Sequence, residues 1–116
     1  MTVRIECVDI DCQDPQQLAR FWMQVLDYEV ASEEPEEIAI PAKDGSGWEL
    51  LFCTVPDDKV VKNRWHIDLR PDDHAAEVAR LEALGAKRVD IGQGEQTWVV
   101  MADPEGNEFC VLRATS

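Results

Sequence analysis

The chain contains one pattern of predicted elements twice, and this repeat constrains the fold more than any other feature. Asp14 and Asp73, each placed to cap a helix, are 59 residues apart, and the same offset separates Cys7 from His66 in the strands before them. Each half reads as a strand, a helix and three further strands. A unit this short cannot bury its sheet face alone, so repeated units pack together. The sequence therefore predicts an α+β fold of two βαβββ modules, at about 1–57 and 62–116, within a single domain spanning 1–116.

Two helices are predicted from capping residues and apolar spacing. Asp14 and Pro15 are suited to an N-cap and a first helical position, and apolar residues follow at helical spacing, which predicts a helix over about 15–27. In the second half, Asp73 precedes a similar stripe and Gly85 follows it, which predicts a helix over about 74–84. Further strands are expected near 5–11, 30, 38–40, 48–55, 64–70, 89–91, 97–102 and 108–113. Turns are expected at 43–47, 92–95 and 103–106.

The predicted strand at 64–70 has two unlike faces. One face is apolar and the other is polar, because residues of the two kinds alternate along it. The first module has polar residues at the matching positions. These positions are Cys7, Asp9, His66 and Asp68. A polar face of this kind either contacts water or lines a pocket. Because it occurs in both modules, we expect the four side chains to face each other across a cleft lined by curved mixed sheets.

The four tryptophans and two histidines have different expected environments. Trp22 belongs to the apolar stripe of the first helix, and strand parity assigns Trp48 and Trp65 to the core. Trp98 is expected in or near a pocket. His74 begins the second helix and is expected at the solvated surface.

The net charge of −13 argues against two classes of partner. Nucleic acids and anionic membranes would both be repelled, since the chain has no basic cluster to offset its acidic residues. No apolar run approaches 18 residues and no signal-peptide pattern is present, so we expect a cytoplasmic protein. The four cysteines form no CxxC motif and are expected to be reduced.

Four stretches carry a resemblance to a known family. They are DPQQLARFWMQVLDYEV at 14–30, KNRWHIDLRPDD at 62–73, the helix end LEALGA at 81–86 and WVVMADPEGNEFCVL at 98–112. The chain resembles glyoxalase-like proteins of the vicinal oxygen chelate superfamily, which includes glyoxalase I, bleomycin-resistance proteins, fosfomycin-resistance enzymes and extradiol dioxygenases. This resemblance implies paired βαβββ modules, in agreement with the repeat.

The resemblance also identifies positions for metal ligands. Metal-using members typically place two histidines and two glutamates there. This chain has Cys7, Leu51, His66 and Cys110 at these positions, with Glu49 as a stand-in for Leu51. Hard octahedral metals prefer oxygen and imidazole ligands, whereas thiolates favour zinc. We therefore predict no bound metal, with a zinc ion on Cys7, His66 and Cys110 as the alternative.

Two functions follow from the resemblance, both at a small-molecule pocket. The first is a lyase or isomerase acting on a small organic metabolite, with His66 as the catalytic acid or base. The second is a metal-free drug- or metabolite-binding protein like the bleomycin-resistance proteins, which the missing carboxylate ligands favour. The residues expected to bind the small molecule are Cys7, Asp9, Glu49, Leu51, Asp68, Trp98 and Cys110. A homodimer is expected because superfamily members often pair two chains and because open sheet edges need covering.

Overall fold

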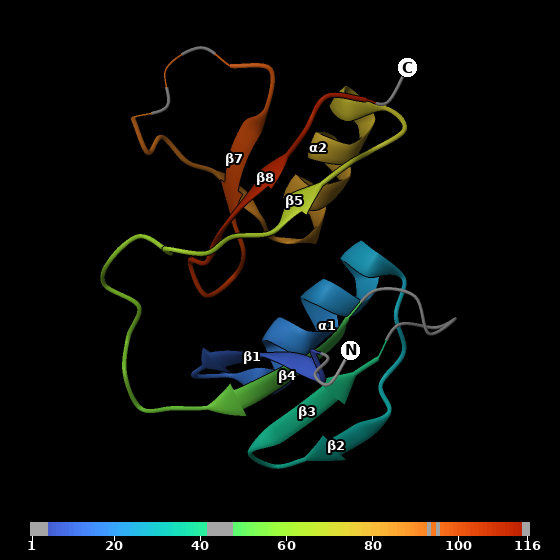
Figure 1. Ribbon diagram of the computed structural model, residues 1–116, viewed down its shortest axis with the longest axis vertical. Coiled ribbons are helices and arrows are strands. Elements are labelled where there is room, and N and C mark those ends of the chain that lie inside the picture. The colour runs from blue at the N-terminus through green and yellow to red at the C-terminus, as the bar shows by residue number, and fades with distance from the viewer. Residues whose placement is uncertain (1–4, 42–47, 93, 95, 115–116) are drawn as a thin grey trace. The chain divides into compact units, whose positions relative to one another are not determined.

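The computed structural model describes residues 5–41, 48–92, 94 and 96–114. The chain divides into two compact units, Met1–Asp58 and Lys59–Ser116 (Figure 1). Within the described residues, each unit contains a four-stranded mixed sheet and one helix. The α+β fold of two βαβββ modules is therefore confirmed.

The first unit is built around a sheet with the strand order β1-β4-β3-β2. Its elements are β1 (Cys7–Cys12), α1 (Pro15–Leu26), β2 (Ser32–Glu34), β3 (Glu37–Ile40) and β4 (Glu49–Thr54). Strands β1 and β4 pair in parallel, whereas the β2–β3 and β3–β4 pairs are antiparallel. The parallel pair follows from the helical crossover, since parallel neighbours need a long connection.

The second unit repeats this plan with the order β5-β8-β7-β6. Its elements are β5 (Asp68–Leu69), α2 (His74–Leu84), β6 (Lys87–Arg88), β7 (Val99–Ala102) and β8 (Glu108–Val111). Strands β5 and β8 pair in parallel, and β7 pairs antiparallel with both β6 and β8. The cleft between the modules, the single-domain assignment and the homodimer stay predictions.

Both helices begin and end where the capping residues predict. The Asp14 Oδ1 atom accepts a hydrogen bond from the Gln17 backbone N–H at 3.1 Å, and Asp73 caps α2 through the Ala76 N–H at the same distance. Helix α2 ends at Gly85, whose φ of +117° is a conformation that favours glycine.

Removing either cap should destabilise the protein by a similar amount. Asp14→Ala and Asp73→Ala are each expected to lower the free energy of unfolding by about 1 kcal/mol, because each leaves an N–H group of the first helical turn without its acceptor. Asparagine at the same position is the matched control, since it caps nearly as well. Urea unfolding followed by circular dichroism measures the difference. Equal losses for the alanine and asparagine variants would contradict the capping role.

The predicted strand at 64–70 is shorter than expected. Strand β5 contains only Asp68 and Leu69, although the Ile67 carbonyl also accepts a hydrogen bond from the Cys110 N–H at 2.9 Å. Before Ile67, the Asn63 N–H donates to the Glu108 carboxylate at 2.9 Å, and the Asn63 side-chain amide donates to the Glu108 backbone carbonyl at 3.3 Å. Each of these two hydrogen bonds to β8 involves a side chain, unlike the backbone-to-backbone bonds of a strand ladder. The regular alternation of a ladder therefore does not extend back to residue 65.

Three predicted environments are wrong. Trp65 is 90% exposed and Trp48 is 55% exposed, so neither tryptophan belongs to the core. Trp65 precedes the paired part of β5 and Trp48 precedes β4, so strand parity does not fix their orientation.

His74 is half-buried instead of solvated, and its Nε2 atom is buried without a hydrogen-bond partner among the described residues.

Predicted strands and turns agree with the structure in part. The strand expected at 89–91 is instead β6, Lys87–Arg88, although the Val89 N–H still donates to the Val100 carbonyl at 3.0 Å. The turn at 103–106 is confirmed, since the Gly106 N–H donates to the Asp103 carbonyl at 2.8 Å and Gly106 has a φ of +89°. The turn expected at 43–47 lies outside the described residues, as do positions 93 and 95 of the turn at 92–95.

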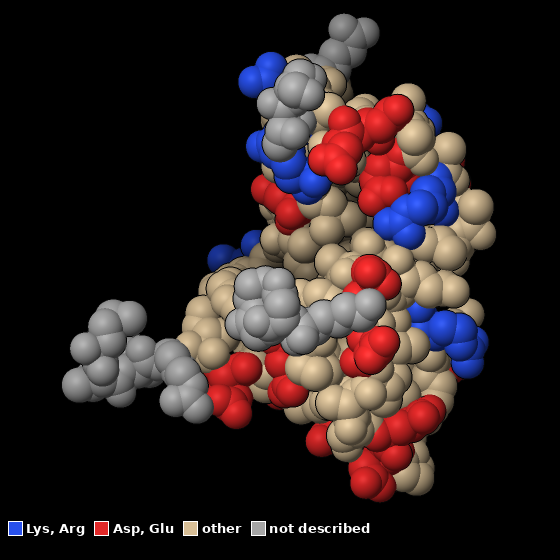
Figure 2. All heavy atoms as spheres, turned by 90° about the vertical axis from the view of Figure 1, so that its right-hand side faces the viewer, with Lys and Arg blue, Asp and Glu red and all other residues tan. Residues whose placement is uncertain are grey.

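Acidic side chains are spread over the face that Figure 2 shows, with basic side chains between them. This distribution accords with the net charge of −13. In the part of the chain that the structure describes, neither helix has the length and apolar character needed to cross a membrane.

Candidate functional site

Three side chains that can bind metals or exchange protons come together in the second unit. His66, Asp68 and Cys110 each place one donor atom within 4.8 Å of the other two. The parallel pairing of β5 with β8 sets Asp68 directly beside Cys110, so the two side chains share a face of the sheet. His66 lies two residues before Asp68, which corresponds to the same face in an extended chain. We call this group the His–Asp–Cys cluster.

The imidazole and the carboxylate of the cluster are in direct contact. The distance from His66 Nε2 to Asp68 Oδ1 is 3.2 Å, and the two side chains are 40% and 50% exposed. Solvent screening at this exposure makes the pair a small contributor to stability. Its significance is geometric, because a carboxylate beside one ring nitrogen fixes the tautomer and leaves the other nitrogen open to a ligand.

The third member of the cluster, Cys110, is nearly buried, with 6% of its surface exposed. Burial raises the pKa of its thiol, and the charge of the adjacent Asp68 carboxylate and a hydrogen bond to it raise the pKa further. The sulfur is therefore a neutral thiol near pH 7. It acts as a nucleophile or a metal ligand only when a cation removes its proton.

The four candidate residues of the first unit lie together on one face of its sheet. Cys7 pairs with Glu49, and Asp9 pairs with Leu51, across the parallel strands β1 and β4. The Cys7 thiol donates a hydrogen bond to Asp9 Oδ1 at 3.2 Å. This bond, followed by burial and by the charges of Asp9, Glu49 and Glu6, raises the pKa of Cys7 to about 11. Cys7 is thus also a neutral thiol.

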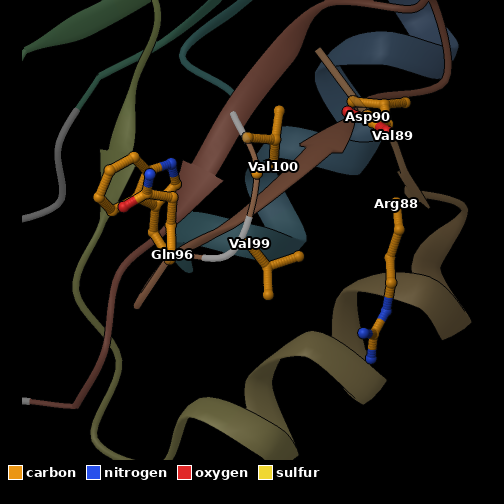
Figure 3. A pocket seen from close by; sticks show the side chains of 8 residues that line it. Arg88, Val89, Asp90, Gln96, Val99 and Val100 are labelled. Atoms are coloured by element: carbon orange, nitrogen blue, oxygen red, sulfur yellow. The ribbon is translucent and has the colours of Figure 1, made fainter. Parts of the chain in front are cut away.

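A hollow of about 640 Å³ is lined in part by residues of β7, the strand that neighbours β8. Val100 pairs with Cys110 across β7 and β8, and Val100 also lines the hollow. The other lining residues include Arg88, Val89, Asp90, Gln96 and Trp98. Figure 3 shows Val99 and Val100 pointing to opposite sides of their strand and Arg88 extending toward α2. Trp98 does line a hollow, and its contact with a ligand stays a prediction.

Glu108 is a residue that the sequence reasoning missed. The 59-residue offset makes it the counterpart of Glu49, so the repeat contained the signal for it. Its carboxylate accepts hydrogen bonds from Lys59 Nζ at 3.0 Å and from the Asn63 N–H at 2.9 Å. Burial acts to raise the pKa of Glu108, but the bonds from Asn63 and Lys59 outweigh it, and the pKa is lowered. Glu108 therefore positions the segment that leads to His66.

The family resemblance implies a divalent metal, so the donor atoms of the cluster can be compared with the ligands that each metal prefers. The cluster offers an imidazole nitrogen, a carboxylate oxygen and a sulfur, all of which zinc accepts. Manganese and magnesium prefer oxygen ligands, so the sulfur fits them poorly. Within the second unit Asp68 is a donor that the ligand set expected from the sequence did not contain. Cys7 of that expected set lies in the first unit, and its part in a metal site stays a prediction. If bound, the ion would polarise a carbonyl oxygen of a ligand as a Lewis acid.

Comparison with known families gives one match that covers most of the chain. The model of the glyoxalase-like domain family matches residues 7–112. None of the curated proteins matches the chain.

Solved structures with the same fold come from proteins of different activities. The chain superposes with a TM-score of 0.74 on a fosfomycin-resistance protein FosX mutant from Listeria monocytogenes, at 16% identity over 99% of this chain and 93% of that one. That structure contains manganese(II) and 1S,2S-dihydroxypropylphosphonic acid. A glyoxalase/bleomycin resistance/dioxygenase family enzyme from Burkholderia phytofirmans gives a TM-score of 0.71, at 16% identity over 91% and 94%. The oxidase ChaP-H2 gives 0.68, at 18% identity over 100% and 98%. At these identities the likeness shows the fold alone.

Proposed function

Since the chain belongs to the glyoxalase-like domain family, we propose that it binds a small organic metabolite and acts on it as a lyase or isomerase. The observation that carries this proposal is the contact between His66 and Asp68, 3.2 Å apart and both open to solvent. An imidazole oriented by a carboxylate is a common arrangement for a general base. The lyase or isomerase class follows because proton transfer alone can drive such reactions, without an oxidant or a second substrate.

Asp68 and His66 have separate roles in this proposal. Asp68 accepts the hydrogen on His66 Nε2, so that the Nδ1 lone pair can take a proton from a carbon next to a carbonyl group. The electron pair of the broken C–H bond moves onto the carbonyl oxygen. The proton then returns to a neighbouring atom in an isomerase, or a leaving group departs in a lyase. Cys110 stays protonated and packs beside the pair.

The hollow beside β7 is suited to the less polar part of such a molecule. Trp98 and the valines supply apolar surface, while Gln96 and Asp90 supply a few polar groups. Binding sites for small molecules commonly combine these features. Val100, which lines the hollow, is the strand partner of Cys110, so we expect a small metabolite held at the hollow to lie near the cluster.

Hydrogen exchange tests the proposal across a series of candidate substrates. Small α-hydroxy aldehydes and ketones would be incubated with the full chain in D₂O and chelator, and deuterium at the carbon next to the carbonyl would be measured by NMR. His66→Gln should slow the exchange of an accepted compound by about 10²–10⁴-fold, the usual contribution of a general base. Asp68→Asn should give a smaller loss.

The second histidine of the chain provides a matched control. His74 begins α2 and is outside the cluster, so His74→Gln should exchange at the wild-type rate. Equal loss in both histidine variants, or undiminished exchange in His66→Gln, would contradict the role of His66.

A metal-free binding protein is the second candidate, favoured by the residues at the family's ligand positions. Of these positions only His66 holds a residue of the usual type, since the others are Cys7, Leu51 and Cys110. A drug-like or metabolite molecule would then be held at the hollow without reaction. Quenching of tryptophan fluorescence by a compound that shows no deuterium exchange in wild-type protein would support this candidate over the enzyme.

A further inference from the structure

We infer that the hollow beside β7 selects substrates that carry an aromatic ring without an acidic substituent, and that Trp98 is the residue that determines this preference. The inference rests on the proposed function and makes it more specific, because it names the class of metabolite on which His66 acts.

The size of the hollow favours a molecule larger than a three-carbon metabolite. Its volume of about 640 Å³ lies within the range of about 300–1,000 Å³ that is typical of ligand pockets. A three-carbon compound would leave most of this space to water and would bury little apolar surface. A ring fills more of the hollow, and it gains the free energy of removing a larger apolar area from water.

The position of the hollow relative to the His–Asp–Cys cluster favours an extended molecule. Val100, Cys110 and Asp68 are successive register partners on β7, β8 and β5, so they form one row across the sheet. Neighbouring strands are about 4.8 Å apart, which separates the backbones of Val100 and Asp68 by about 10 Å. A molecule that reaches from the hollow to the cluster therefore needs a bulky group at one end and a carbonyl group at the other.

Trp98 provides a surface on which an aromatic ring can stack. It lines the hollow, and its side chain is half-buried. Among the residues that the structure describes, no ring of the protein stacks on this indole and no acceptor bonds its N–H, whereas Trp22 meets the ring of Phe21. The ring face and the N–H of Trp98 are therefore open to a ligand. Stacking of two aromatic rings adds about 2- to 10-fold to affinity beyond the burial of area.

The charged residues of the hollow disfavour an acidic ring. Arg88 Nε lies 3.5 Å from Glu82 Oε2, and Figure 3 shows the Arg88 side chain extending toward α2, so its charge is directed at the helix. The Asp90 carboxylate accepts a hydrogen bond from the Gly92 N–H at 2.8 Å and supplies a negative charge at the hollow. A carboxylate on the ring would be repelled by Asp90, and the net charge of −13 adds to this repulsion.

A series of hydroxymethyl ketones tests the inference with the full chain in D₂O and chelator. The second group on the carbonyl is methyl, cyclohexyl, phenyl or 4-carboxyphenyl, and NMR measures deuterium at the hydroxymethyl carbon. Each kcat/KM is divided by the exchange rate constant of the same ketone in buffer, which removes differences in intrinsic acidity. We expect the corrected value for the phenyl ketone to exceed that for the cyclohexyl ketone by about 2- to 10-fold. It should exceed the methyl ketone by at least about tenfold, and the carboxyphenyl ketone should fall below it.

Matched variants assign the preference to Trp98. Trp98→Ala should reduce the phenyl-to-cyclohexyl ratio to about one, whereas Trp98→Phe retains a ring and should keep the ratio above one. The ratio compares two substrates in one protein, so a general loss of folded protein does not change it. Trp65→Ala is the control and should keep the wild-type ratio, because that indole is 90% exposed and lies outside the hollow. A ratio of one in wild-type protein, or an unchanged ratio in Trp98→Ala, would overturn the inference.

Binding measurements separate a failure of this inference from a failure of the proposed function. Isothermal titration calorimetry gives the Kd of the phenyl and cyclohexyl ketones for wild-type protein and Trp98→Ala, whether or not deuterium is exchanged. Tighter binding of the phenyl ketone that depends on Trp98, without exchange, would support the preference of the hollow and contradict the proton-transfer role of His66. Exchange at equal corrected rates for the two ketones would do the opposite. Absence of both binding and exchange for the phenyl ketone would overturn both.

Discussion

Trp22→Ala is expected to lower the free energy of unfolding by about 3–5 kcal/mol, the usual cost of truncating a large buried aromatic side chain. Trp22 is 2% exposed on α1, and its indole meets the Phe21 ring edge-on with centroids 5.2 Å apart. Truncation removes the apolar surface that the helix buries and leaves a cavity that the surrounding sheet cannot fill completely. Urea unfolding followed by far-ultraviolet circular dichroism measures the loss, since it does not depend on tryptophan emission.

The same substitution at Trp65 is the control. Trp65 is 90% exposed, so Trp65→Ala should change the free energy of unfolding by no more than about 0.5 kcal/mol. The two variants remove the same atoms, and burial alone separates their expected effects. If Trp65→Ala proved as costly as Trp22→Ala, the Trp65 indole would have to be covered in solution, for example by a second copy of the chain.

The contrast between these tryptophans shows which parts of the fold the sequence could predict. The cap and the apolar spacing of helix α1 are both local signals, so they predict the helix, and the core position that they predict for Trp22 is confirmed. Alternation predicts a core position for Trp65 only if the strand is regular along its whole length. The interaction of Asn63 with Glu108, 45 residues away, ends that regularity, and nothing near Trp65 in the sequence indicates it.

The candidate site was predictable residue by residue but not as a group. The family resemblance identified His66 and Cys110 from their positions in known motifs. The sequence puts Asp68 on the same strand face as His66, but its place beside Cys110 depends on the parallel register of β5 and β8. A register between strands 42 residues apart is set by the folded backbone, so the convergence of three donors required the structure.

Asp103→Ala should destabilise the protein by about 3 kcal/mol, because Asp103 organises the turn before β8. Its side chain is a buried carboxylate, 4% exposed. The Oδ1 atom accepts hydrogen bonds from the backbone N–H groups of Glu105 and Asn107, both at 2.9 Å, and the Asn107 side chain donates to both carboxylate oxygens. Alanine would leave these donors without acceptors in a partly buried turn, and each such loss costs about 1–3 kcal/mol.

Asparagine at the same position separates the contribution of charge from that of shape. Asp103→Asn keeps an oxygen for the two backbone N–H groups but turns an NH₂ group toward the Asn107 amide, so about half of the loss is expected. Chemical denaturation measures the loss for both variants. A loss below about 1 kcal/mol for Asp103→Ala would mean that the backbone hydrogen bonds of the turn, from Gly106 N–H to the Asp103 carbonyl and from Asp103 N–H to the Asn107 carbonyl, hold it without the side chain.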